Sequence, residues 1–193
     1  MKSLFIILIL AGFIWALNSC DTAKTDTASA VNVAPSKDSL IKRGHYLVSI
    51  IGCNDCHSPK KMGAQGPFVD TALALSGFPA NEPAPVATPE QLKNGLPVFA
   101  ADLTAAAGPW GTSFSANITS DATGIGNWTL DQFKNALRNG KYLGLKEERM
   151  LMPPMPWEDF AHMDDADVEA IFTYLKSTKP VKNVVPAYRP PGK

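Results

Sequence analysis

The sequence predicts a mainly α-helical domain in which a long, loop-rich segment separates the first helix from the later ones. Apolar residues recur at helical spacing in three stretches, residues 40–51, 129–140 and 164–180. Residues 60–127, in contrast, are rich in proline, glycine and alanine and show no sustained periodicity. Because structureless segments of that length are uncommon in compact domains, we expect an ordered loop with short helical turns. Its aromatic residues would be costly to leave exposed together: Phe68, Phe78, Phe99, Trp110 and Phe114.

Residues 1–19 are typical of the signal peptide of a bacterial lipoprotein. Lys2 precedes an apolar run, Leu4–Leu17, that is shorter than the roughly 20 residues a membrane-spanning helix needs. The run ends in Leu-Asn-Ser-Cys, which resembles a lipobox, so Cys20 is expected to be lipidated and to become the first mature residue. An ordinary signal peptide followed by an unrelated cysteine is the alternative. The expected location is outside the cytoplasm, on a membrane facing the periplasm or the cell exterior.

The rest of the chain divides by composition. Residues 20–37 are small and polar and cannot bury enough apolar surface to fold, so they are expected to form a flexible tether. Residues 38–185 form the predicted domain, and the proline-rich tail 186–193 is expected to be loosely held. The formal net charge is +0, so no strong electrostatic field favours nucleic acid as a partner.

Each predicted helix has recognisable ends. The first is expected to begin at Asp38 or Ser39 as N-cap and to lead the chain to Cys53. The second has Thr129 as N-cap with Gln132 three residues later, a capping box, and Gly140 as its stop. The last has Asp164 as N-cap, acidic residues in its first turn, and Pro180 as its end.

The segment Cys53-Asn54-Asp55-Cys56-His57 is C-x-x-C-H, the pattern of covalent c-type haem attachment. Two thiols at this spacing add to the two haem vinyl groups as thioethers, and the adjacent histidine ligates the iron. The motif occurs once, which predicts one haem c. One alternative interpretation of this motif is a structural zinc site, which would need four ligands. A thioredoxin-like redox pair would need a βαβ context, and a plain disulfide between Cys53 and Cys56 is the third alternative.

From about Leu40 to Val184 the chain resembles bacterial class I c-type cytochromes. The stretches "GPWGTSFSANIT", "TGIGNWTLDQFKNALRNGKY" and "PPMPWEDFAHMDDADVEAIFTYLKS" are similar to those of exported monohaem cytochromes, some of which occur beside dehydrogenases. The resemblance implies a class I fold whose first and last helices cross at Gly44. It also implies that the carbonyl of Pro67 accepts a hydrogen bond from His57. The segment between His57 and Thr129 is much longer than in small cytochromes of this class.

In that class the second axial ligand comes from the loop before the last helix, and here that loop offers Met150, Met152 and Met155. Met155 stands between two prolines that stiffen the backbone, so we predict that Met155 is the ligand and rank Met152 second. His45 and His162 are rival ligands, each more often a surface or capping residue.

A haem with both axial positions filled has no site for a substrate, so the predicted function is electron transfer rather than catalysis. The expected partners are redox proteins: a dehydrogenase, a quinol-oxidising complex or a terminal oxidase. The alternative is a haem enzyme, such as a peroxidase, or a gas sensor, either of which would keep the sixth coordination position open.

Overall fold

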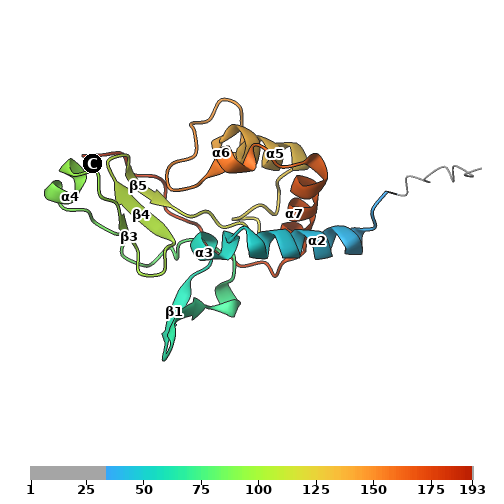
Figure 1. Cartoon of the computed structure of the whole chain (residues 1–193), viewed down its shortest axis with the longest axis horizontal. Helices are drawn as coiled ribbons and strands as arrows, with labels where there is room; N and C mark the ends of the chain where they lie inside the picture. The colour runs from blue at the N-terminus through green and yellow to red at the C-terminus, as the bar shows by residue number, and fades with distance from the viewer. Residues whose placement is uncertain (1–33, 193) are drawn as a thin grey trace, which may run out of the picture. The chain divides into compact units, whose positions relative to one another are not determined.

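The computed structural model describes residues 34–192, along which helices alternate with the strands of two small sheets (Figure 1). The α-helices are α2 (Lys37–Ile50), α3 (Cys53–His57), α4 (Pro89–Lys93), α5 (Leu130–Asn139), α6 (Trp157–Phe160) and α7 (Asp165–Ser177). The strands are β1 (Lys60–Gly63), β2 (Gly66–Val69), β3 (Val98–Phe99), β4 (Ala105–Gly108) and β5 (Gly111–Phe114). Two 3₁₀-helices are η1 (Thr71–Leu73) and η2 (Tyr142–Gly144). The predicted signal peptide, Cys20 and most of the predicted tether lie outside the described residues.

Helices α2 and α7 pack against each other at Gly44, as the resemblance implied. A Cβ atom on Gly44 would lie only 2.0 Å from the carbonyl oxygen of Ala170 and 2.6 Å from the Cβ of Tyr174. Only glycine therefore allows the two backbones to approach this closely. The core around the crossing consists of buried residues from α2, α5, α7 and two loops: Leu47, Val48, Leu75, Ile125, Phe133, Val168, Ala170, Ile171 and Leu175.

The ends of α5 are as predicted, and the beginning of α2 is not. In α5 the Thr129 hydroxyl accepts from the Gln132 amide, the Gln132 side chain accepts from the Thr129 amide, and Gly140 ends the helix at φ 60°. Helix α2 begins earlier than expected, with Ser36 as its N-cap and the Ser39 amide donating to the Ser36 hydroxyl. Ser36 has the extended backbone that an N-cap requires, whereas Asp38 and Ser39 lie inside the helix.

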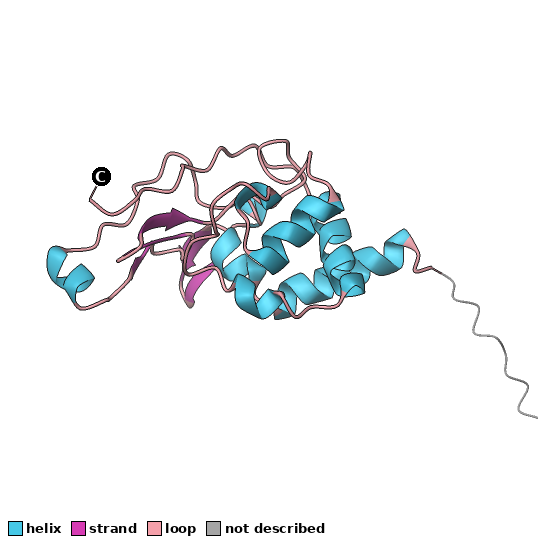
Figure 2. Cartoon of the chain, turned by 90° about the horizontal axis from the view of Figure 1, so that it is seen from above, coloured by secondary structure: helices cyan, strands magenta, loops and turns pink. Residues whose placement is uncertain are grey.

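The prediction of a mainly α fold does not describe residues 60–114. Strands β1 and β2 form an antiparallel hairpin that projects beside α3, and β3, β4 and β5 form an antiparallel sheet in that order. Figures 1 and 2 show the three-stranded sheet to one side of the packed helices. Strand β4 is buried at every position but consists of alanine and glycine, which carry little sequence preference for strands. Residues 34–192 are therefore a mixture of helices and small sheets.

The proline-rich tail is held by the domain, which differs from the expectation that it is loose. Arg189 pairs with Thr112 of β5 through two backbone hydrogen bonds, of 2.8 and 3.0 Å. The hydroxyl of Tyr188 also donates to the carbonyl of Trp110. The tail thus extends the edge of the β3–β5 sheet because β5 offers unpaired backbone groups there.

The aromatic residues of the long segment differ in their burial. Phe78 is buried and packs on Phe114 with ring centroids 4.9 Å apart. Phe68 and Phe99 remain 54% and 42% exposed, so the five aromatic residues are not all left exposed together, but two of them are. Within residues 34–192, no helix is both long and apolar enough to cross a membrane.

Candidate functional site

The two cysteines and the histidine of the haem motif lie on one short helix, α3, which follows α2 almost directly. Gly52 separates the two helices and adopts φ 79°, a left-handed conformation that side chains disfavour. Cys53 and Cys56 are three residues apart, so their side chains lie on the same face, one above the other. The motif is thereby presented as one rigid unit at the end of α2.

The ring of His57 is oriented by a hydrogen bond from Nδ1 to the carbonyl oxygen of Ala116, at 2.8 Å. Because a carbonyl only accepts, the proton lies on Nδ1, which leaves the lone pair of Nε2 free to bind a metal. Burial lowers the pKa of His57, although the same hydrogen bond opposes this effect. The geometry therefore favours a neutral imidazole with one fixed tautomer, which is the form that ligates haem iron.

The predicted role of Pro67 is wrong. Pro67 lies in β2, where it pairs with Met62 and is exposed, and the His57 ring donates to Ala116 instead. The acceptor is 59 residues away from His57 in the sequence, on the loop that follows β5. The Gly66-Pro67 pair on which the expectation rested belongs to strand β2 of the hairpin.

Residues that the sequence did not single out hold the loop of Ala116 in place. Asn117 is 4% exposed, and its oxygen accepts from the amide and hydroxyl of Thr119 at 3.0 and 2.7 Å. Its nitrogen donates to the carbonyl of Val181 at 2.8 Å. Gly77 donates its amide to the His57 carbonyl at 2.8 Å and leaves no room for a Cβ atom beside Ala116. Asn117 lies in the stretch "GPWGTSFSANIT", which resembles class I cytochromes, but the resemblance did not assign a role to Asn117.

Both thiols of the motif are free and partly buried, and their surroundings do not favour thiolates. Burial raises the pKa of Cys53 to about 11, and burial also raises that of Cys56. A redox-active C-x-x-C pair would instead need a lowered thiol pKa. Two free thiols beside a neutral imidazole fit the donor set of a covalently attached haem. Within residues 34–192, no group of three or more His, Cys, Asp or Glu side chains is arranged to hold a metal ion.

The candidate distal ligands lie on the loop between η2 and α6. Met155 is partly buried in a tight turn, in which its amide donates to the Met152 carbonyl at 3.3 Å and its carbonyl accepts from Trp157 at 3.0 Å. The methyl group of Met150 lies beside Gly140. Met152 is partly buried as well, so burial alone does not rank it against Met155.

The rival histidines lie on surfaces. His45 is exposed on α2, with its ring edge against Tyr174 at a centroid distance of 5.1 Å. His162 is exposed just before α7.

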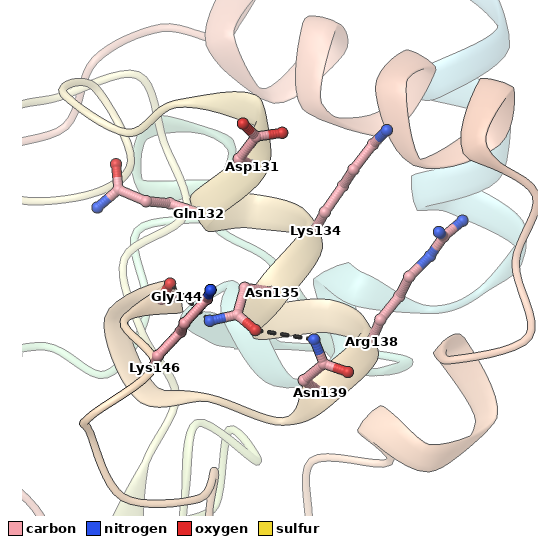
Figure 3. Close-up of a pocket in the computed structure, with 8 residues that line it drawn as sticks. All are labelled: Asp131, Gln132, Lys134, Asn135, Arg138, Asn139, Gly144 and Lys146. Atoms are coloured by element: carbon pink, nitrogen blue, oxygen red, sulfur yellow. Dashed lines mark hydrogen bonds between the residues drawn. The ribbon is translucent and has the colours of Figure 1, made fainter.

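A pocket of about 380 Å³ lies along α5, and neither the haem motif nor the methionine loop contributes to its lining (Figure 3). Lys134 and Arg138 extend from the same side of this helix, and both pair with Asp165, at 3.0 and 2.5 Å. These hydrogen bonds lower the pKa of Asp165. Lys134 and Arg138 therefore share one carboxylate partner, which offsets only one of their two positive charges.

The chain is similar to cytochrome subunits of dehydrogenases. It is 34% identical over 141 residues to the gluconate 2-dehydrogenase cytochrome c subunit of Pantoea cypripedii, a match over 72% of this chain and 23% of that protein. It is 29% identical over 169 residues to the cytochrome c subunit of the quinone alcohol dehydrogenase of Gluconobacter oxydans, a match over 86% of this chain and 27% of that protein. This similarity supports the interpretation of the chain as a c-type cytochrome. It agrees with the C-x-x-C-H motif and with the orientation of His57.

The similarity is confined to part of each relative. The chain spans about a quarter of the length of these two cytochrome subunits. A third match, 41% identical over 80 residues, covers 41% of this chain and only 6% of a nicotinate dehydrogenase component of Pseudomonas putida. No protein-family model matches the chain.

Proposed function

We propose that this chain is an electron carrier with one covalently attached haem c. Cys53 and Cys56 would hold the haem as thioethers, and His57 and Met155 would supply the two axial ligands. The observation that carries the proposal is the hydrogen bond from His57 Nδ1 to Ala116, because it leaves the Nε2 lone pair free on the opposite side of the ring. The haem would supply one-electron oxidation and reduction.

The protein's own part in this function is to hold both ligands and leave no position for a substrate. His57 is fixed on α3 by Ala116, and Met155 is fixed in a turn between two prolines. A thioether ligand opposite a histidine favours the ferrous state and raises the reduction potential. We therefore propose a carrier rather than a peroxidase or gas sensor, in which the sixth position would be open.

The proposed electron donor is a dehydrogenase. The similar proteins are named as cytochrome c subunits of gluconate and quinone alcohol dehydrogenases, and they match most of this chain. A carrier of this kind would accept electrons from such an enzyme and pass them to a quinol-linked complex or a terminal oxidase. The chain would act either as a fixed subunit or as a shuttle between them.

We further propose that the carrier is a lipoprotein attached to a membrane through Cys20 and facing the periplasm or the cell exterior. The support is the apolar run and lipobox-like sequence of residues 4–20. A lipoprotein carries several acyl chains, which anchor a protein far more firmly than one. Mass spectrometry of the mature chain tests this directly: a first residue other than a lipidated Cys20 rejects the anchor.

The axial ligation is tested on holoprotein made in a cell with haem-attachment machinery. The ferric wild type should show the far-red sulfur-to-iron charge-transfer band, and its reduced form should not bind carbon monoxide promptly at neutral pH. Met155→Leu should abolish the band and open the iron to carbon monoxide. Met152→Leu, on the same loop, should leave both properties unchanged. A band that survives Met155→Leu excludes Met155 as ligand, and prompt carbon monoxide binding by the wild type rejects the carrier.

A further inference from the structure

We propose that Ser113 of β5 is a positioning residue for the distal ligand, through a hydrogen bond that anchors the methionine loop. The inference rests on the proposed function, in which Met155 ligates the haem. In this proposal the long segment before α5 helps to set the strength of that ligation. The composition of the segment alone suggests only an irregular insertion.

The need for such an anchor follows from the composition of the loop. Residues 152–156 contain three prolines, so only Met152 and Met155 carry a backbone N–H. The Met155 amide is used within the turn, where it donates to Met152. The rest of the protein can therefore hold this loop mainly by donating hydrogen bonds to the loop's backbone carbonyl groups. Among the hydrogen bonds of residues 34–192, one joins this segment to a part of the chain beyond the adjoining helix α6, and it runs from Ser113 to the carbonyl of Pro153.

The geometry at Ser113 makes this bond the preferred use of its hydroxyl. The side-chain oxygen lies 2.5 Å from the Pro153 carbonyl and 3.3 Å from the Ala106 carbonyl. A hydroxyl has one proton, so the shorter contact receives it. The indole N–H of Trp110 donates to the same oxygen at 3.3 Å. Ser113 is 8% exposed, so water does not readily replace a lost partner there.

Strand β5 is itself held from both sides, which makes it a firm base for the contact. Ser113 pairs with Ala106 of β4, and Thr112 pairs with Arg189 of the tail. Gly111 adopts φ 102°, and a Cβ atom there would lie 2.2 Å from the Arg189 carbonyl oxygen. The tail is thereby seated against β5, next to the serine.

Two further anchors lie at the start of the loop. The Leu151 amide donates to the Gly140 carbonyl at 2.6 Å before the proline-rich segment begins. The Arg149 guanidinium lies 4.0 Å from the ring centroid of Tyr142 and 5.1 Å from that of Tyr188, so this end also contacts the tail. The Pro153 carbonyl that Ser113 holds comes after these anchors and two residues before Met155. Loss of its bond should free the segment that aims the thioether.

The test is a titration of the ferric holoprotein with imidazole, which competes with the thioether for the iron. Ser113→Ala should bind imidazole about tenfold more tightly than the wild type, the factor expected when one hydrogen bond no longer holds the native ligand. Ser113→Thr, which keeps the hydroxyl, should return the affinity to that of the wild type. Ser115→Ala is the matched control, because the Ser115 side chain makes no hydrogen bond in the described part of the chain.

The outcomes separate this inference from the proposed ligation. Equal imidazole affinity in Ser113→Ala, Ser113→Thr and the wild type overturns the positioning role, even if Ser113→Ala lowers the melting temperature. If Met155→Leu keeps the far-red band, the ligation itself is wrong and the role of Ser113 falls with it. If Met155→Leu loses the band while Ser113→Ala stays like the wild type, only the positioning role is rejected.

Discussion

Substitution of Gly44 by alanine should disrupt the contact between α2 and α7 rather than strengthen α2. Helix propensity alone predicts a gain of about 1 kcal/mol, since alanine is favoured over glycine inside a helix. The added methyl group, however, would lie 2.0 Å from the Ala170 carbonyl oxygen and 2.6 Å from the Ala170 carbonyl carbon, both backbone atoms that cannot rotate away. Overpacking of a tight core costs roughly 1–3 kcal/mol, and a backbone clash belongs at the upper end.

The net expectation for Gly44→Ala is a loss of about 2 kcal/mol in the free energy of unfolding. For a domain of this size that corresponds to a fall of roughly 4–8 °C in melting temperature. Guanidinium unfolding of the holoprotein, followed by far-UV circular dichroism, measures the change. Ser39→Ala, at an exposed position of the same helix, is the control, because Ser39 bonds to the N-cap Ser36 through its backbone amide and not its side chain, and it should change stability by no more than about 0.5 kcal/mol. Equal or greater stability in Gly44→Ala would refute the close approach of the two helices.

Three further predictions concern the motif, its supporting loop and one surface ion pair. Cys53→Ala or Cys56→Ala should sharply lower the yield of holoprotein, and release of haem from the denatured wild type into acidified organic solvent would contradict covalent attachment. Asn117→Ala should lower the free energy of unfolding by about 3 kcal/mol in guanidinium, since it leaves buried partners unpaired, whereas a loss below about 0.5 kcal/mol would show the network to be dispensable. The hydrogen bond from Arg43 lowers the pKa of Asp167 in the folded protein. This ion pair therefore stabilises the fold fully above pH about 4, and the stabilisation is lost as the pH falls through the pKa of Asp167 in the folded state. Asp167→Asn should flatten this part of the pH–stability curve, and an unchanged curve would exclude the pair as its source.

Local features were predictable because their partners lie within a few residues. The capping box of Thr129 and Gln132 and the stop at Gly140 are formed inside a single helix, so their pattern is readable without knowledge of the fold. The same holds for the haem motif, residues 53–57, which one short helix brings together. The crossing at Gly44 was predictable only through a resemblance, since the partner residue Ala170 is far away in the sequence.

The strands of residues 98–114 could not be predicted from their composition. Strand β4 is Ala-Ala-Ala-Gly, a run without β-branched or aromatic residues, and it becomes a strand because β3 and β5 pair with it on both sides. The tail differs from its prediction for a similar reason. Its prolines suggested a loose segment, but the exposed edge of β5 supplies the backbone groups that Arg189 needs.

The sequence by itself determined the chemistry of this protein, and the tertiary structure decided how that chemistry is held. The two cysteines and the histidine of residues 53–57, and their spacing, are fixed by the sequence alone, as is the placing of Met155 between two prolines. The acceptor of the His57 proton and the donor to the Pro153 carbonyl come instead from segments 59 and 40 residues away. Such contacts depend on the path of the whole chain, because a backbone carbonyl or a serine hydroxyl is present almost everywhere and only folding selects which one is near.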